Sequence, residues 1–247
     1  MSRDHDALFA NGRAAPGSFR FDAKVARVFD DMIRRSVPGY AATVAMSGWL
    51  AARFAQPHTA CMDLGCSLGA TLLACADAMT EAGLTDVDLI GVDSSADMLE
   101  RCRSRLEPEL GARQPKLIEA DVRTVALPPS SVIVLNWTLQ FLPPADRAPL
   151  LARIHAAIIP GGALILSEKV IDTDAEAQQL AERLHADFKR SQGYSELEIA
   201  AKRTAIEDVL IPETLDAQKA RLLDVGFQPV LVWYRQFNFA SLLAVKV

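Results

Sequence analysis

Short apolar runs alternate with longer amphipathic runs through the middle of this chain of 247 residues, and this alternation constrains the fold more than any other feature. The strand-like runs cover 60–63, 88–93, 116–120, 131–136 and 163–167, and the helix-like runs between them include 69–81, 95–110 and 145–159. Strands that are apolar throughout are buried on both faces, and intervening helices allow neighbouring strands to run parallel. The sequence therefore predicts an α/β fold with a parallel sheet covered by helices on both faces.

Two helices are predicted before the alternating region. Asp22 is placed as an N-cap, and the apolar residues that follow it recur at helical spacing. A second helix over 41–55 ends before a proline. The start of the chain is polar and rich in Gly and Ala, so we expect residues 1–20 to form a flexible arm. The remainder, 21–247, is then a single domain with its N-terminal helices over 21–56.

The end of the chain departs from the alternation in two ways. A helical insertion is predicted over about 172–210, and its second helix begins with a capping box at Ser195. The last two β-rich runs, 228–237 and 239–247, are separated only by Asn238. That link is too short for a helical crossover, so these two strands are expected to pair antiparallel.

Charge and composition exclude several classes of protein. The chain has 26 basic and 31 acidic residues, a net charge of −5, and half of its residues are hydrophobic. Enough apolar surface is available to offset the conformational entropy lost on folding, so disorder is not expected. The mild acidity argues against a broad electrostatic grip on nucleic acid or on an anionic membrane. We therefore expect neither direct nucleic-acid binding nor membrane association.

The uncharged segment 124–145 is long enough to raise the question of a membrane span, but its four prolines favour loops around a buried strand. No apolar stretch typical of a secretory signal is visible near the N-terminus. The cysteines form no CxxC pair, and no histidine lies at zinc-finger spacing from them. Reduced thiols, no metal site and a cytoplasmic location are the expected consequences.

The loop between the first strand and its helix, DLGCSLG from Asp63 to Gly69, is the strongest sign of a ligand site. Small residues here let the backbone approach a ligand at the carboxyl end of a sheet. Ser67 stands where a dinucleotide-binding loop has its middle glycine, which weakens that interpretation. An ordinary tight strand–helix turn would carry the same residues.

Polar residues end the next three strands as well. Asp93 is placed to accept hydrogen bonds from a ribose, Asp121 from an adenine amino group, and Asn136 to point into a cleft. Each position also has a simpler explanation. Asp93 would serve equally as a helix cap, Asp121 as a surface carboxylate, and Asn136 as a cap for the following loop.

Taken together, these turns, the IPGGALI turn at 159–165 and the antiparallel strand pair resemble the class I S-adenosylmethionine-dependent methyltransferase fold. The resemblance covers about 60–167 and 228–247. It implies a Rossmann-like seven-stranded sheet with an antiparallel terminal strand, here carrying a helical insertion. This fold alone does not identify the reaction.

Longer strings resemble the family of carboxy-S-adenosyl-L-methionine synthases, from Phe21 to Lys246. They are FDAKVARVFDDMIRRSVPGY, MDLGCSLGAT, LNWTLQFLPP, GGALILSEK, HADFKRSQGYSELEIAAKR and WYRQFNFASLLAVK. Two departures are a divergent N-terminal arm and Trp137, where the family often has Phe. The resemblance implies that S-adenosylmethionine and prephenate give carboxy-S-adenosylmethionine, phenylpyruvate and water, for wobble-uridine modification of tRNA.

The reaction that this resemblance implies requires few chemical groups from the protein. A sulfonium acidifies its methyl group, which becomes a carbon nucleophile on deprotonation. Prephenate becomes aromatic by losing carbon dioxide, the electrophile, and hydroxide, the base. The protein would position the partners and exclude water, with no protein nucleophile and no metal.

The resemblance also implies roles for individual residues. Gly65, Cys66 and Ser67 would contact the amino-acid part of the cofactor, Asp93 and Ser94 its ribose, and Asp121 and Val122 its adenine. Tyr40 would lie near the cofactor, with packing on the core as its alternative, and Asn136 beneath the reacting group. The family's arginine for the new carboxylate falls on Arg203, which from spacing alone would be a solvated helix residue.

Further expectations follow from the family. It is dimeric, with the insertion as a candidate interface, and its product serves a downstream tRNA carboxymethyltransferase. Lys169, His185 and Arg190 are candidate prephenate contacts, although solvated or ion-paired roles suit them equally. The alternatives to this function are a conventional methyltransferase acting on a small molecule or tRNA, and a cofactor-binding protein without catalytic activity.

Overall fold

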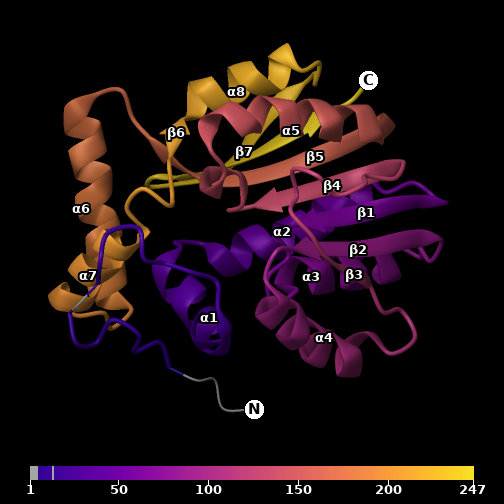
Figure 1. Cartoon of the computed structure of the whole chain (residues 1–247). Helices are drawn as coiled ribbons and strands as arrows, with labels where there is room; N and C mark the ends of the chain where they lie inside the picture. Colours follow the sequence, from indigo (N-terminus) through magenta and orange to yellow (C-terminus); the bar gives the residue numbers. More distant parts are fainter. Residues whose placement is uncertain (1–4, 13) are drawn as a thin grey trace.

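A computed structural model describes residues 5–12 and 14–247 of the chain. The main sheet has the strand order β3-β2-β1-β4-β5-β8-β7 (Figure 1). Its strands are β1 (Thr59–Leu64), β2 (Val87–Asp93), β3 (Lys116–Glu119), β4 (Ser130–Asn136), β5 (Ile158–Ile171), β7 (Val230–Gln236) and β8 (Phe239–Val245). The first five run parallel, whereas β8 is antiparallel to both of its neighbours. The predicted α/β sheet with an antiparallel terminal strand is confirmed.

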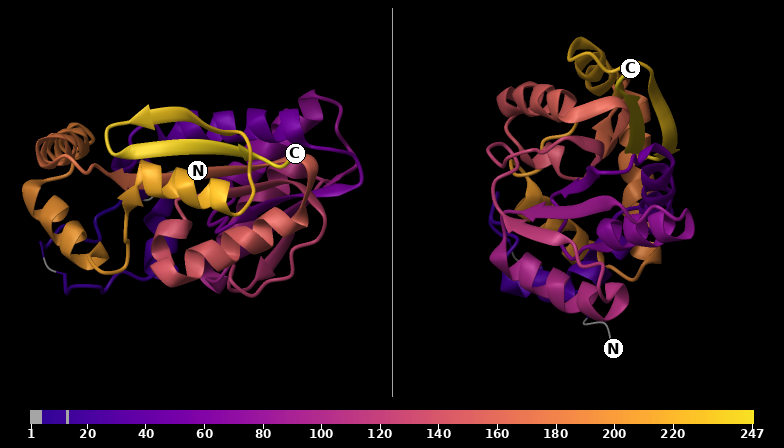
Figure 2. Two further views of the ribbon diagram at one scale, coloured as in Figure 1. Left: turned by 90° about the horizontal axis from the view of Figure 1, so that it is seen from above. Right: turned by 90° about the vertical axis from the view of Figure 1, so that its right-hand side faces the viewer.

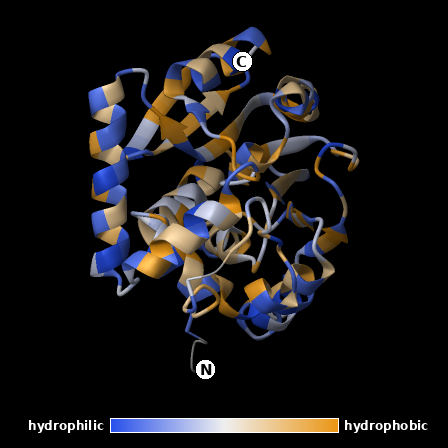
Figure 3. Ribbon diagram, turned by 60° about the vertical axis from the view of Figure 1, so that its left-hand side comes forward, coloured by the Kyte–Doolittle hydropathy of each residue, from blue (hydrophilic) through white to orange (hydrophobic). Residues whose placement is uncertain are grey.

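Helices cover both faces of this sheet (Figure 2). On one face, α2 (Tyr40–Phe54) and α3 (Ala70–Glu81) pack in one apolar cluster with residues of β1, β2, β4 and β5, and α4 (Ala96–Leu110) lies beside α3. The opposite face is covered by α5 (Pro144–Ala157) and α8 (Leu215–Asp224). Apolar residues concentrate in the strands between these layers (Figure 3). Burial of this apolar surface on both faces is the main source of stability.

Side-chain caps explain where several helices begin. In α1 (Ala23–Ser36), the predicted N-cap Asp22 accepts hydrogen bonds from the backbone N–H groups of Lys24 and Val25. The side chain of Ser95 caps α4 in the same way. The predicted capping box opens α7 (Glu196–Ile206), because the side chains of Ser195 and Glu198 accept from each other's backbone N–H groups.

The sheet extends beyond its predicted limits at β5. The sequence pattern places a helix up to 159 and a strand over 163–167, but α5 ends at Ala157 and β5 runs from Ile158 to Ile171. The extension pairs with β8 on one side and with a two-residue strand, β6 (Glu213–Thr214), on the other. The sequence pattern does not predict this extension, because Glu168 and Lys169 are charged and charged residues inside a buried strand are rare. The main path keeps the expected seven strands, with β6 as an addition.

The insertion forms two helices, α6 (Ala175–Ser191) and α7, which stand at one side of the molecule with α1 (Figure 1). The carboxyl ends of the parallel strands point toward them (Figure 1). Part of the N-terminal segment lies on α7. Asp6 is buried, its carboxylate accepts a hydrogen bond from the Tyr194 hydroxyl, and Lys202 Nζ lies 3.5 Å from its Oδ2. The insertion is therefore held by contacts with the N-terminal segment, in addition to its covalent connections to β5 and β6.

The described residues include no helix that is long and apolar enough to cross a membrane. The same residues bring no three His, Cys, Asp or Glu side chains together in an arrangement for a metal ion. All four cysteines are free thiols with buried side chains.

Candidate active site

A cavity of about 1150 Å³ lies at the carboxyl ends of the parallel strands and is also lined by residues of α1, α6 and α7. It is lined by all ten residues for which a catalytic or cofactor-binding role is predicted from the sequence. These are Tyr40, Gly65, Cys66, Ser67, Asp93, Ser94, Asp121, Val122, Asn136 and Arg203. They come from separate segments of the chain, and only the fold brings them to one place. The roles assigned to them individually stay predictions.

The loop after β1 is held by backbone hydrogen bonds to the neighbouring strand. The N–H groups of Gly65 and Cys66 donate to the carbonyl of Val92 at 2.7 and 2.9 Å. Gly65 has a φ of 84°, and a Cβ built on it would lie 2.1 Å from the hydroxyl oxygen of Thr138. Glycine is therefore required at this position both for conformation and for space.

Ser67 takes a left-handed conformation with a φ of 51°, although it has a side chain. Its backbone N–H donates a 2.9 Å hydrogen bond to Oδ2 of Asp93, whose Oδ1 accepts from the N–H of Ser95. The Asp93 carboxylate thus joins the β1 loop to the residue that begins α4. The helix-cap explanation of Asp93 is wrong, because the N-cap of α4 is Ser95, and the other lone pairs of Asp93 stay available to a ligand.

Asp63, the first residue of the DLGCSLG segment, is a titratable group for which no individual role is predicted from the sequence. Its side chain is only 3% exposed, and within the described part of the chain its carboxylate makes no hydrogen bond. Burial raises the pKa of Asp63 to about 8, and the nearby Asp93 carboxylate contributes to the same shift. Burial also raises the pKa of Asp93. Such a pair favours a cationic ligand, which would restore the ionised form of both carboxyls.

Asn136 and Trp137 form the floor of the cavity at the end of β4. The amide nitrogen of Asn136 donates to the hydroxyls of Ser47 and Thr71 at 3.2 Å each. Trp137 has a φ of 57° and stacks at a tilt on Tyr40, with ring centroids 5.3 Å apart. Ser67 and Trp137 are thus two bulky or polar residues in the left-handed region, both at the cavity, where such strain is typical of functional sites.

Asp121 lies at the rim of the cavity with a partner of its own. Its Oδ2 is 2.6 Å from the guanidinium of Arg123, which also reaches Asp146 at 2.7 Å. The hydrogen bond from Arg123 lowers the pKa of Asp121, so this carboxylate stays ionised. Neighbouring Val122 is buried and gives the same rim an apolar surface.

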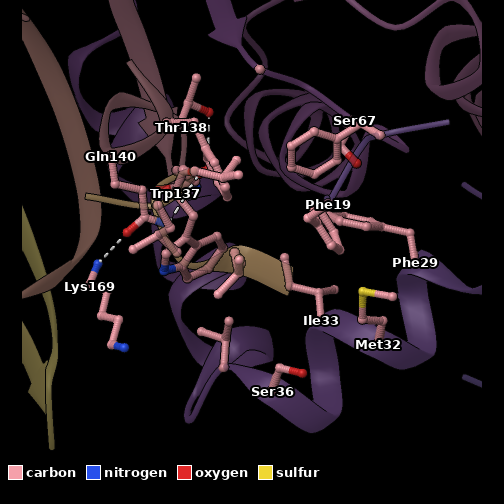
Figure 4. A pocket seen from close by; sticks show the side chains of 18 of the residues that line it. Phe19, Phe29, Met32, Ile33, Ser36, Ser67, Trp137, Thr138, Gln140 and Lys169 are labelled. Atoms are coloured by element: carbon pink, nitrogen blue, oxygen red, sulfur yellow. Dashed lines mark hydrogen bonds between the residues drawn. The ribbon is translucent and has the colours of Figure 1, made fainter. Parts of the chain in front are cut away.

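Helix α1 supplies an apolar wall to the cavity. Figure 4 shows Phe29, Met32, Ile33 and Ser36 along this helix, facing the space between Phe19 and Trp137. The apolar spacing predicted the helix correctly, but it gave no sign of a cavity. One face of α1 therefore serves both the fold and the cavity.

The insertion closes the far end of the cavity with basic residues. Arg203 on α7, Lys169 on β5 and His185 on α6 all line it. Arg203 is exposed, and no ion pair holds it in the described part of the chain. Arg190 does not line this cavity. It pairs instead with Asp187 and Glu196 and borders a second hollow between α6 and α7.

Two further basic residues of this end are not predicted from the sequence. Lys189 lines the cavity one helical turn after His185, and Lys202 precedes Arg203. In the sequence, His185 and Lys189 stand four positions apart, which places them on one face of a helix. The apolar residues of the same helix are the stronger signal, and they do not indicate a site. Glu168, which precedes Lys169, does not line the cavity. It is buried in β5, where its carboxylate accepts from the N–H groups of Leu139 and Gln140 at 2.9 Å.

Comparison with known proteins identifies the family. A family model described as a methyltransferase domain matches residues 61–162. Carboxy-S-adenosyl-L-methionine synthase of Photobacterium profundum is 48% identical over 241 residues, which cover 98% of each chain. The protein of that name from Trichlorobacter lovleyi is 48% identical over 247 residues, the full length of both chains.

Solved structures agree on the fold. Magnesium protoporphyrin IX methyltransferase from Synechocystis PCC 6803 with bound SAH is 17% identical with a TM-score of 0.61, covering 87% of each chain. Human N-acetylserotonin methyltransferase in complex with SAM is 15% identical with a TM-score of 0.60, covering 91% of this chain and 55% of that one. These likenesses show the class I methyltransferase fold. The full-length relatives show more, and this chain belongs to the carboxy-S-adenosyl-L-methionine synthase family.

Proposed function

We propose that this protein is a carboxy-S-adenosyl-L-methionine synthase that takes its carboxyl group from prephenate. One observation carries the proposal beyond the family name. A single cavity joins the carboxylates at the ends of β1 and β2 to Arg203 of the insertion, for which the described residues supply no ion pair. A cationic cofactor suits the first end, and a new carboxylate on that cofactor suits the second.

The proposed reaction balances without an additional reagent. The bond between the prephenate ring and its ring carboxyl group breaks, and hydroxide leaves as the ring becomes aromatic. The hydroxide takes a proton from the cofactor's methyl group and forms water. The released carbon dioxide bonds to the methyl carbon, so the products are carboxy-S-adenosylmethionine, phenylpyruvate and water.

The residues at the strand ends fit an S-adenosyl group. Asp63 is a buried carboxyl without a hydrogen-bonding partner among the described residues, and a positively charged sulfonium or ammonium group supplies what it lacks. Gly65, Cys66 and Ser67 bring backbone close to the amino-acid part. Asp93 and Ser94 face the ribose, while Asp121 and Val122 border the adenine. The sulfonium, when bound, makes its own methyl group acidic.

Three residues are proposed to act at the reacting end. Arg203 holds the developing carboxylate through a charge-assisted hydrogen bond, which contributes about 1.5–3 kcal/mol. Asn136 lies beneath the methyl group, where its amide is oriented by the hydroxyls of Ser47 and Thr71. Tyr40 and the ring stacked on it exclude water from this end of the cavity.

The proposal extends to the setting of the reaction. The protein acts in the cytoplasm as a homodimer, with the insertion as the candidate interface. Its product supplies a tRNA carboxymethyltransferase that modifies the wobble uridine. Because the enzyme makes a small molecule, it need not contact tRNA, which is consistent with its net charge of −5.

The purified protein, incubated with S-adenosylmethionine and prephenate, tests the proposal. Mass spectrometry is expected to find phenylpyruvate and a cofactor heavier by the mass of one carbon dioxide. The same carboxylated cofactor is expected among the small molecules that copurify with the protein. Prephenate left unchanged, with only S-adenosylmethionine or its demethylated product bound, would favour a conventional methyltransferase.

A further inference from the structure

The charged residues of the cavity are unevenly distributed along its length. The strand ends contribute acids, whereas the insertion end contributes four bases and two exposed acids. The bases are Lys169, Lys189, Lys202 and Arg203, and the acids are Glu182 and Glu207. Arginines near the acidic end are already engaged. Arg123 pairs with Asp121, and Arg105 lies 3.5 Å from Asp30. A third arginine of the lining, Arg20, donates to the backbone carbonyls of Gly17 and Phe19. Most of the positive charge of the cavity that no acid engages therefore lies on the side of the insertion.

Two lysines at this end have ammonium groups without a directly bonded partner among the described residues. Within residues 5–12 and 14–247, the ammonium groups of Lys169 and Lys189 make no hydrogen bond and no ion pair. Figure 4 shows Lys169 anchored through its backbone N–H, which donates to Oε1 of Gln140 at 2.9 Å, while its ammonium group is free. Lys202 differs from both, because it pairs with the buried Asp6.

These cations line one cavity, and they repel one another. Burial lowers the pKa of Lys189 to about 7, and Lys202, Lys169 and Arg203 lower it in that order of importance. Burial also lowers the pKa of Lys169, with Arg203 adding to the effect and Glu182 opposing it. Glu182 and Glu207 are the acids that line this end, and both are exposed. Like charges gathered in a half-buried space cost stability unless an anion binds between them.

His185 lies among these cations without adding to their charge. Its Nε2 donates to the backbone carbonyl of Ser36 at 2.8 Å, and its ring packs edge-on against Phe239. Burial first, and then Lys189, lower the pKa of His185 to about 3, so the ring is neutral. The attraction for an anion thus comes from the lysines, while His185 forms a fixed, uncharged wall.

We propose that Lys169 and Lys189 bind the carboxylate that the donor retains, and that Arg203 is left for the carboxylate that is transferred. This assignment rests on the proposed function. A donor that loses one carboxyl group needs a second anchor to hold its remainder in place during transfer. The two lysines come from β5 and α6, whereas Arg203 comes from α7, so the two anionic groups have anchors on separate elements.

The test compares Lys169→Gln, Lys189→Gln and the double variant with the wild-type protein. Lys116→Gln serves as a matched control, because Lys116 is exposed on β3 and does not line the cavity. Each cavity substitution is expected to raise KM for prephenate by about tenfold to a hundredfold, the effect of one charge-assisted hydrogen bond. KM for S-adenosylmethionine is expected to stay unchanged. The melting temperature is expected to stay unchanged or to rise.

Two outcomes would overturn the assignment while leaving the proposed function intact. An unchanged KM for prephenate in the double variant would show that the lysines do not bind the donor. An equal rise in KM for S-adenosylmethionine would assign them to the cofactor's own carboxylate.

The lysine site is also testable if the proposed function fails. Should the wild-type protein produce no carboxylated cofactor, calorimetric binding of phenylpyruvate, which keeps the same carboxylate, decides the matter. The double variant is then expected to bind phenylpyruvate at least about tenfold more weakly than the wild type. Equal binding by the two proteins, or none by the wild type, would overturn the lysine site.

Discussion

Oδ2 of Asp93 accepts a 2.9 Å hydrogen bond from the backbone N–H of Ser67, so the end of β2 is attached directly to the loop that follows β1. The left-handed φ of Ser67 points its N–H at this carboxylate. This contact explains why serine is tolerated at position 67, where a dinucleotide-binding loop has its middle glycine. The cost of the strained conformation, about 1–2 kcal/mol, is offset by a hydrogen bond to a charged acceptor.

A comparison of Gly65 with Gly83 distinguishes two reasons for glycine, namely a positive φ and the lack of space for a Cβ. Both have a positive φ, 84° and 71°, but a Cβ at Gly65 would meet Thr138 whereas one at Gly83 would meet nothing within 4 Å. We expect Gly83→Ala to lower the free energy of unfolding by about 1–2 kcal/mol and to leave cofactor binding unchanged. Gly65→Ala is expected to cost more and to abolish S-adenosylmethionine binding, measured by urea denaturation and calorimetry. Equal effects of the two changes would contradict this account of the loop.

Asp63 makes cofactor binding dependent on pH. Its pKa of about 8 means that it is protonated at lower pH in the free protein, whereas a cationic ligand favours the ionised form. Affinity for S-adenosylmethionine is therefore expected to rise with pH up to about 8 and then level off. In Asp63→Asn, calorimetry is expected to show weaker binding without this rise. Asp88→Asn, a change at an exposed residue of β2, should behave as wild type. A pH-independent affinity in the wild-type protein would contradict the role given to Asp63.

Arg203 is expected to discriminate between the two forms of the cofactor. Arg203→Ala should weaken binding of carboxy-S-adenosylmethionine by about 1.5–3 kcal/mol and change binding of S-adenosylmethionine little. Arg190→Ala removes an exposed arginine of the same insertion that does not line the cavity, and it should affect neither ligand. Competition calorimetry measures both affinities. Equal losses for the two cofactors in Arg203→Ala would mean that this arginine supports the fold alone.

Lys189 is expected to destabilise the free protein. Its pKa is lowered to about 7 by burial, Lys202, Lys169 and Arg203, so its penalty is complete below that pH. As the pH rises from about 7 toward the unfolded value of 10.5, the unfolded state binds more protons than the folded state and stability increases. Lys189→Met should therefore melt at a higher temperature than wild type, most clearly at or below pH 7. A lower melting temperature would indicate a structural role.

The regular elements could be predicted because their signals are local. The helix placed over 69–81 is found as α3, Ala70–Glu81, and the capping box at Ser195 begins α7 as expected. Periodicity and caps depend on neighbours within one turn. The extension of β5 through Glu168 and Lys169 was missed for the opposite reason. Glu168 is tolerated in a buried strand only because the N–H groups of Leu139 and Gln140, far along the chain, bind its carboxylate.

The residues of the site that could be predicted differ in the same way from those that could not. Gly65, Asp93 and Asn136 lie at the ends of predicted strands, where topology alone places them at one edge of the sheet. The free lysines of the insertion end could not be recognised in this way. The resemblance makes Lys169 a candidate contact of the donor and gives Lys189 no role. The significance of both lysines comes from the lack of a directly bonded partner among the described residues. That property depends on how α6 packs against α1, α7 and Phe239 of β8.

Incubation of the purified protein with prephenate and S-adenosylmethionine deuterated in its methyl group tests the central claim most directly. Mass spectrometry is expected to find a cofactor that has lost one deuterium, gained the mass of carbon dioxide, and accumulated in step with phenylpyruvate. Conversion to S-adenosylhomocysteine with transfer of the intact deuterated methyl group, and no consumption of prephenate, would contradict the account.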